Sequence, residues 1–171
     1  MEVLRVLNIA PTQLHSNRWV ALHAFWLLCE VLGLKPTLRS FLHFFGTRPG
    51  DRIGWVSLVG QSKNSFLHPF TTSYKRFKEG FFKVVIEEEG RPFFFDGETP
   101  RFPFYWTKDS TRFYMWSRSL MTEDDLEVLS VLDGLPRQIP TWALVRAYLS
   151  SDKMVDVDGM WLLLVSALFL L

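Results

Sequence analysis

Hydrophobic positions repeat with a helical period near the start of the chain. Between Arg18 and Leu32 an apolar stripe recurs every third or fourth residue, which is typical of a helix face. Ser16 is a favourable N-cap before this stretch, and Gly33 is a favourable residue to end it. Apolar residues also occupy the other faces. The pattern therefore predicts a central helix over 18–32 that is buried on most sides.

A second helix is predicted directly afterwards. Its apolar side chains follow the i, i+3, i+4, i+7 spacing of a helix and are Leu38, Phe41, Leu42 and Phe45. Thr37 starts this helix after Pro36, and Gly46 followed by Pro49 is expected to end it.

The middle of the chain changes to the period of a strand. We expect strands over 53–58, 82–86, 93–95 and 102–106, where apolar runs or alternation replace the helical spacing. Asp96-Gly97 predicts a hairpin turn, and Pro103 restricts the last strand to a sheet edge. The mixed stretch from Ser65 to Glu79 suggests a helical turn or two.

Helical spacing returns in the last third. Thr122 and Asp125 have the spacing of a capping box, and Leu126, Leu129 and Leu132 are expected to face inward. Thr141 is expected to cap a short helix with an apolar side of Trp142, Val145 and Leu149. The chain is therefore predicted to be α+β, mainly helical with a small antiparallel, aromatic-rich sheet in the middle.

Length and composition fit one domain. The 171 residues are 48% hydrophobic and 16% aromatic, enough to bury a core and to exclude disorder of the whole chain. We expect residues 1–150 to form a single domain and residues 151–171 to form an acidic linker and an apolar tail. The tail from Met160 to Leu171 has one polar residue, Ser166, but is shorter than the roughly 20 residues that span a membrane. A buried helix, an aggregation-prone cryptic tail and a weak membrane anchor stay open, and the length argues against the anchor.

Cysteine content and the N-terminus indicate an intracellular protein, in the cytoplasm or the nucleus. Cys29 is the only cysteine, which excludes an internal disulfide, and its apolar surroundings predict a buried thiol. The first residues carry Glu2 and Arg5 where a signal peptide would be apolar.

The net charge of +1 hides an uneven distribution. Residues 1–83 carry eleven Lys and Arg against four Asp and Glu, and residues 84–171 carry eight against fourteen. The positive charges of residues 1–83 can be compensated by the negative charges of residues 84–171 within one molecule, which is the interpretation we favour. A head-to-tail assembly of dipolar molecules is the alternative.

No pattern in the sequence indicates an enzyme, a cofactor or a metal. The four histidines lack a second ligand at metal spacing, and phosphate-binding loops and nucleophile motifs are absent. No small-molecule substrate is indicated either. We therefore expect a protein without catalytic activity.

One stretch has the composition of a nucleic-acid site. Basic and aromatic residues interleave there, which suits the backbone and the bases of single-stranded RNA or DNA. The candidate residues are Tyr74, Lys75, Arg76, Phe77, Lys78 and Lys83. The alternative is that the aromatic rings face the core and the basic side chains face water, and the alternation in a chain this rich in Phe favours that alternative.

Several segments, in order and with their spacing, resemble the gypsy-type transposon domain of plants, which occurs in gag-like, retrotransposon-derived reading frames. They are 7–45, 55–61, 73–84, 91–96 and 102–107. The resemblance implies a non-enzymatic, gag-like domain that associates with itself or with nucleic acid, and it implies no catalytic residues. Because the family has further sequence before Glu2–Asn8, we expect a truncated start. A protein-binding module and a degenerate remnant remain alternatives.

Overall fold

The computed structural model describes residues 2–49, 54–60, 65–68, 94–111 and 115–149. Within them the chain is α+β, as predicted. The helices are α1 (Glu2–Leu7), α2 (Ser16–Val31), α3 (Leu38–Phe44), α4 (Glu123–Asp133) and α5 (Thr141–Leu149), with the 3-10 turns η1 (Pro11–Gln13) and η2 (Arg118–Leu120). The strands are β1 (Phe45–Pro49), β2 (Val56–Gly60), β3 (Leu67–His68), β4 (Phe95–Asp96), β5 (Thr99–Pro100) and β6 (Ile139–Pro140).

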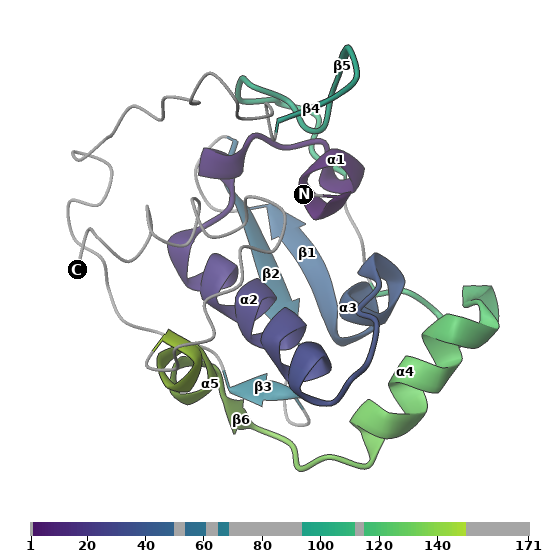
Figure 1. The fold of residues 1–171 in the computed structure, drawn as a ribbon. Helices are drawn as coiled ribbons and strands as arrows, with labels where there is room; N and C mark the ends of the chain where they lie inside the picture. Colours follow the sequence, from purple (N-terminus) through teal and green to yellow (C-terminus); the bar gives the residue numbers. More distant parts are fainter. Residues whose placement is uncertain (1, 50–53, 61–64, 69–93, 112–114, 150–171) are drawn as a thin grey trace.

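Helix α2 lies across the β1–β2 hairpin and forms the centre of the molecule (Figure 1). Strands β1 and β2 are antiparallel, with Phe45 opposite Gly60 and Pro49 opposite Val56. A second pair, β3 and β6, is parallel. Strand β6 follows α4 in the chain and leads directly into α5 (Figure 1). The β4–β5 hairpin stands next to α1 at the opposite end.

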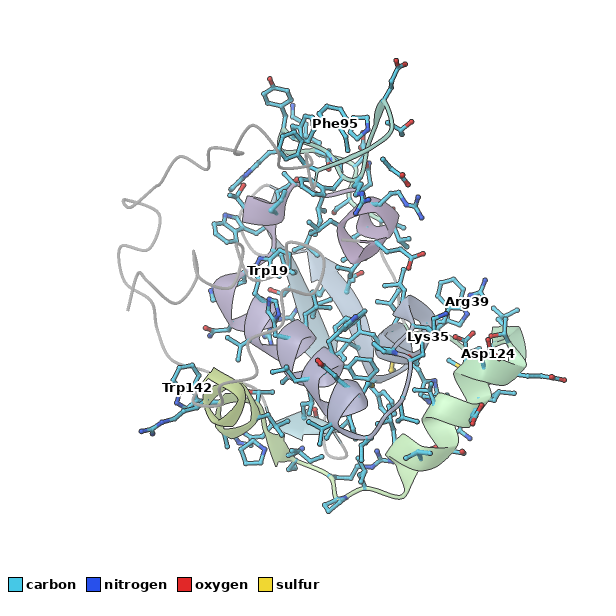
Figure 2. All side chains as sticks on the ribbon, in the orientation of Figure 1. Trp19, Lys35, Arg39, Phe95, Asp124 and Trp142 are labelled. Carbon is cyan, nitrogen blue, oxygen red and sulfur yellow. The ribbon has the colours of Figure 1, made fainter. Side chains whose placement is uncertain are left out.

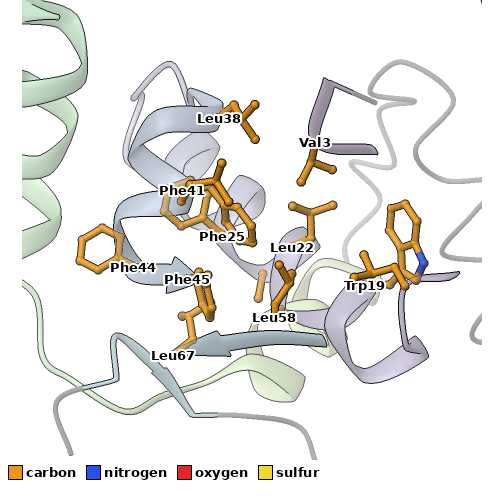
Figure 3. Close-up of a cluster of buried hydrophobic side chains, with 14 of the residues drawn as sticks. Val3, Trp19, Leu22, Phe25, Leu38, Phe41, Phe44, Phe45, Leu58 and Leu67 are labelled. Atoms are coloured by element: carbon orange, nitrogen blue, oxygen red, sulfur yellow. The ribbon is translucent and has the colours of Figure 1, made fainter. Parts of the chain in front are cut away.

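The core lies between α2, α3 and the β1–β2 hairpin (Figure 3). Phe25 of α2 meets Phe41 of α3 edge to face, with ring centroids 5.3 Å apart. Phe41 in turn stacks on Phe45 at 4.7 Å, and Phe44 stacks on Phe66 at 4.6 Å. Offset and edge-to-face contacts of this kind stabilise a core beyond the burial of apolar area. Much of the phenylalanine in the described ranges is thus used for packing.

Local signals predicted the ends of α2 in part. Gly33 has φ +67°, and the amide groups of Gly33 and Leu34 donate to the carbonyls of Glu30 and Cys29 at 3.0 and 2.8 Å. This is a Schellman motif, so the predicted stop is confirmed. The predicted cap at Ser16 is wrong. His15 is the N-cap, because its Nδ1 accepts a hydrogen bond from the Asn17 amide and the helix begins one residue earlier.

The prediction for the second helix is right at its start and wrong at its end. Thr37 caps α3 and accepts a hydrogen bond from the Ser40 amide. The helix stops at Phe44, however, and 45–49 is strand β1 rather than a helix end. The i+7 spacing placed Phe45 on the helix because an apolar residue at this position also suits a buried strand. Pairing with β2 satisfies the backbone hydrogen bonds of 45–49 and decides for the strand.

The predicted middle strands have mixed outcomes. The strand expected over 53–58 is β2, Val56–Gly60, and the turn at Asp96-Gly97 is confirmed as the β4–β5 hairpin, with φ +60° at Gly97. The strand expected over 102–106 is wrong, since this segment forms bends. Hydrogen bonds between residues 106–107 and residues 8–13, each of which uses a side chain, hold it instead of a ladder. The strand expected over 82–86 lies outside the described residues, as does the tail Met160–Leu171.

The last third agrees better with its prediction. Thr122 and Asp125 form the predicted capping box of α4, and Leu129 and Leu132 are buried. Leu126 is 40% exposed and Val128 is buried in its place, so Leu126 does not face the core. Thr141 is the first residue of α5 rather than its cap, and its hydroxyl donates to the His68 carbonyl at 3.0 Å.

Candidate interaction surface

The residues predicted to bind nucleic acid, Tyr74, Lys75, Arg76, Phe77, Lys78 and Lys83, lie outside the described residues. Their role stays a prediction. The candidate surface below is built from other residues.

Two buried titratable side chains, His23 and Cys29, are held in their neutral forms by burial. Burial lowers the pKa of His23 to about 3 and raises the pKa of Cys29 to about 12. Both side chains are therefore neutral near pH 7, and the predicted burial of Cys29 is confirmed. In the part of the chain that the structure describes, no three His, Cys, Asp or Glu side chains gather closely enough to hold a metal ion.

Three consecutive aromatic residues face outward beside the β4–β5 hairpin. We call Phe104, Tyr105 and Trp106 the aromatic rim. Their exposed fractions are 46%, 85% and 49%. Isolated exposed apolar side chains are common, but a contiguous group of large rings is a marker of interaction surfaces. The rim was missed in the sequence because its residues fitted a predicted strand.

Gln13 holds the chain that follows the rim against η1. It is fully buried and uses all of its hydrogen-bonding capacity. Its Nε2 donates to the carbonyls of Gly54 and Thr107, both at 2.8 Å, and its Oε1 accepts from the amides of Ala10 at 2.9 Å and Thr107 at 3.0 Å. A side chain that makes four such bonds fixes three segments far apart in sequence.

Further contacts position Trp106 itself. Its indole N–H donates to the Thr12 hydroxyl at 2.7 Å, and its ring meets Trp55 edge to face at 5.5 Å. Gly54 has φ +88°, and a Cβ at this position would lie 2.9 Å from the Trp106 ring. The close approach therefore needs a glycine at 54. The exposed ring of Trp106 is held by packing and hydrogen bonding together.

Phe104 connects the rim to the hairpin. Its ring contacts Phe94, Phe95 and Phe102 at centroid distances of 5.8, 5.4 and 5.9 Å, each tilted or edge to face. Figure 2 shows Phe95 on the hairpin at the end of the molecule remote from α4 and α5. Phe102 is buried, so this group of rings reaches from the core to the surface.

The charged residues of the same segments nearly balance, with one more acidic than basic residue. Arg101 and Lys108 stand against Asp96, Glu98 and Asp109. A surface that binds nucleic acid through phosphate contacts needs a surplus of Lys and Arg. The rim lacks that surplus.

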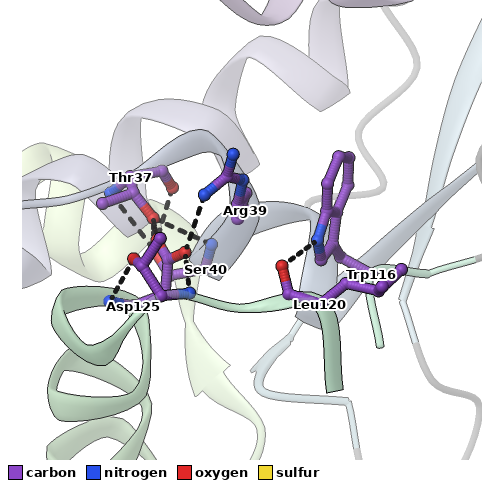
Figure 4. A network of polar contacts seen from close by, with 7 residues as sticks. Thr37, Arg39, Ser40, Trp116, Leu120 and Asp125 are labelled. Carbon is purple, nitrogen blue, oxygen red and sulfur yellow. Dashed lines mark hydrogen bonds and ion pairs between the residues drawn. The ribbon is translucent and has the colours of Figure 1, made fainter. Parts of the chain in front are cut away.

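A second polar feature joins α3 and α4 through Asp125 (Figure 4). One carboxylate oxygen accepts from the Thr37 hydroxyl at 2.6 Å, and the other accepts from the Thr122 amide at 3.0 Å. Burial alone would raise the pKa of Asp125, and the hydrogen bonds from Thr37, Thr122 and Arg39 more than offset it, so the pKa lies below its ordinary value. Asp125 thus serves the N-termini of two helices at once.

The surface beside this junction is a cleft of about 610 Å³ with both signs of charge. The guanidinium of Arg39 lies 5.8 Å from the Trp116 ring centroid and 3.5 Å from Asp125. Figure 2 shows Lys35 and Arg39 beside the end of α4 that carries Asp124. Opposite charges from the two halves of the chain therefore meet here, which supports an intramolecular match at this place.

The comparisons with known proteins give one family. Residues 1–49 match the family described as "Putative gypsy type transposon". This part of the chain contains α1, α2, α3 and β1. It includes Thr12, which bonds Trp106 of the aromatic rim, and Gln13, which bonds Thr107 directly after it. No curated protein and no solved structure matches the chain. Within the described ranges, every helix is too short or too polar to cross a lipid bilayer.

Proposed function

We propose that this chain is a gag-like, non-enzymatic domain derived from a plant gypsy-type retrotransposon, and that it acts by self-association through the aromatic rim. The family match over residues 1–49 supports the transposon origin. Gag proteins act as structural proteins that assemble, so self-association is the activity that such an origin favours.

The exposed rim is the observation that carries the proposal. Interfaces are enriched in aromatic residues, and a few well-held rings dominate their binding energy. Tyr105 is 85% exposed, although both of its neighbours are fixed by ring contacts or hydrogen bonds. Because the rim is already ordered, little conformational entropy is lost when a partner covers it.

A second copy of the chain suits this surface better than nucleic acid does. The charges on 96–109 nearly cancel, which removes the phosphate attraction that nucleic-acid binding needs. Two copies related by a two-fold axis would bring the two rims face to face, and cyclic dimers are the commonest homo-oligomers. Binding of single-stranded RNA through 74–83 would be a separate property of the chain.

Sedimentation velocity of the full chain over a concentration series tests the proposal. The double variant Phe104→Ser/Tyr105→Ser should shift the protein from dimer to monomer while its circular dichroism stays that of a folded protein, although loss of the Phe104 ring contacts should lower its thermal midpoint. Leu120→Ser is the matched control, because Leu120 is also exposed but lies on η2, away from the rim. A wild-type monomer at all concentrations, or a dimer that survives in the double variant, contradicts the proposal.

A further inference from the structure

A cleft of about 660 Å³ lies between α1, α2 and the β4–β5 hairpin. Its volume is within the usual range of small-molecule sites. The apolar part of its wall comes from Val3, Leu22, Pro36, Leu38 and Pro100. The polar part includes Arg101 and Trp26, and these two side chains carry the argument.

Arg101 contributes a buried donor that lacks a partner. Its Nε is shielded from solvent and makes no hydrogen bond in the part of the chain that the structure describes. Its guanidinium also forms no ion pair with any described carboxylate. The backbone is fixed nonetheless, because the Arg101 amide donates to the Phe94 carbonyl at 2.9 Å. A buried charged donor without an acceptor is unfavourable unless a ligand supplies one.

Trp26 lies in the same wall. Its ring is half-buried and contacts Phe25 at 5.5 Å and Phe41 at 5.7 Å, which fix its orientation. Its indole N–H makes no hydrogen bond to a described residue, and an indole nitrogen can only donate. Two residues that carry N–H donors, Arg101 and Trp26, therefore line the cleft beside its apolar wall.

The charges of the lining restrict the ligand. Arg5 and Arg101 are balanced by Glu2 and Asp96, and Glu2 already pairs with Arg5 at 3.6 Å. A ligand with several negative charges would be repelled by Asp96, whereas one oxyanion needs only the Arg101 fork. Guanidinium groups bind carboxylate and phosphate oxygens through paired hydrogen bonds.

We infer that this cleft binds a small ligand through one oxyanion, a carboxylate or a phosphate, which accepts hydrogen bonds from Arg101 and Trp26. The apolar wall formed by the two prolines and Leu38 would cover the remainder of the ligand. This site is separate from the aromatic rim and does not depend on self-association.

The indole N–H signals in a ¹H–¹⁵N spectrum of the full chain give a direct test. Trp26→Phe identifies the Trp26 signal by its loss. Separate titrations with acetate and with inorganic phosphate should shift that signal to a saturating value. The anion that binds with the higher affinity identifies the class of oxyanion. An absence of saturable movement with both anions overturns the inference.

Variants at Arg101 complete the test. Arg101→Gln should lower the affinity for the more tightly bound anion by about tenfold, because the charge-assisted hydrogen bonds from Arg101 are lost. Arg101→Lys should also weaken it, because lysine lacks the planar fork. Arg48→Gln is the matched control, as Arg48 is exposed on β1 outside the cleft, and it should bind like the wild type. Equal affinities in all three variants contradict the inference.

Discussion

The hydroxyl of Thr37 donates a 2.6 Å hydrogen bond to the carboxylate of Asp125, 88 residues further along the chain. Thr37 is the N-cap of α3, and Asp125 is the third residue of α4 and half of its capping box. One buried carboxylate therefore couples the starts of two helices. The pair also ties the segment that matches the transposon family to the last third of the chain.

Removing this carboxylate should destabilise the fold. Asp125→Ala leaves the Thr37 hydroxyl and the Thr122 amide without their acceptor, and we expect a loss of about 3 kcal/mol in the free energy of unfolding. Urea unfolding measures it. Asp124→Ala is the matched control on the same helical turn, where loss of an exposed charge near the helix start should cost about 0.3–1 kcal/mol. Equal losses in the two variants would show that Asp125 has no special role.

Gln13 should be a second point of high sensitivity. Gln13→Ala leaves two amides and two carbonyls around 10, 54 and 107 without partners, so we expect a loss of about 3 kcal/mol in urea unfolding. Gln13→Glu keeps the acceptor but cannot donate, and it should also destabilise the fold. Thr12→Ala removes only the exposed contact with Trp106 and should cost about 1 kcal/mol or less. A loss for Gln13→Ala no larger than for Thr12→Ala would contradict this account.

Stability should fall as the pH is lowered because of His23. Its pKa is about 3 in the folded protein and ordinarily 6.5, so between these values the unfolded chain binds more protons. The free energy of unfolding should therefore drop by up to about 1.4 kcal/mol per pH unit on acidification, with the full stability present above about pH 6.5. His23→Leu should flatten this dependence in urea unfolding at a series of pH values. His68→Gln, which replaces an exposed histidine, provides the control. An identical slope in His23→Leu would assign the effect to other groups.

Cys29 should be unreactive in the folded state. Burial raises the pKa of its thiol to about 12, from an ordinary 9.0, and the side chain is fully buried, so both thiolate formation and access are suppressed. Labelling with a chromogenic disulfide should be slow in buffer and should follow the unfolding curve in urea. Leu120→Cys, with its exposed position, should react at once at the new site. Rapid labelling of the native wild type would contradict the burial.

The sequence predicted features whose interacting residues lie close together in the chain, and it missed features that depend on residues far apart in the chain. Gly33 and the Thr122–Asp125 box were predictable because the partners lie within a few residues. Strand β1 was not, because the helical spacing runs on through Phe45 and only pairing with β2 decides its conformation. The Gln13–Thr107 and Thr37–Asp125 contacts join residues 94 and 88 positions apart, and no local pattern marks them. The exposed rim was concealed for the same reason, since contacts from 8–13 override its strand-like alternation.

The position of Tyr105 gives the most direct test of self-association. In a two-fold dimer with the rims face to face, Tyr105 of each copy lies near the axis, so the variant Tyr105→Cys should form an intermolecular disulfide under mild oxidation. The native Cys29 is buried and should not interfere. Non-reducing electrophoresis should show a covalent dimer for Tyr105→Cys and little for Leu120→Cys at the same protein concentration. Equal dimer yields for the two variants, or none for Tyr105→Cys, would contradict assembly through the aromatic rim.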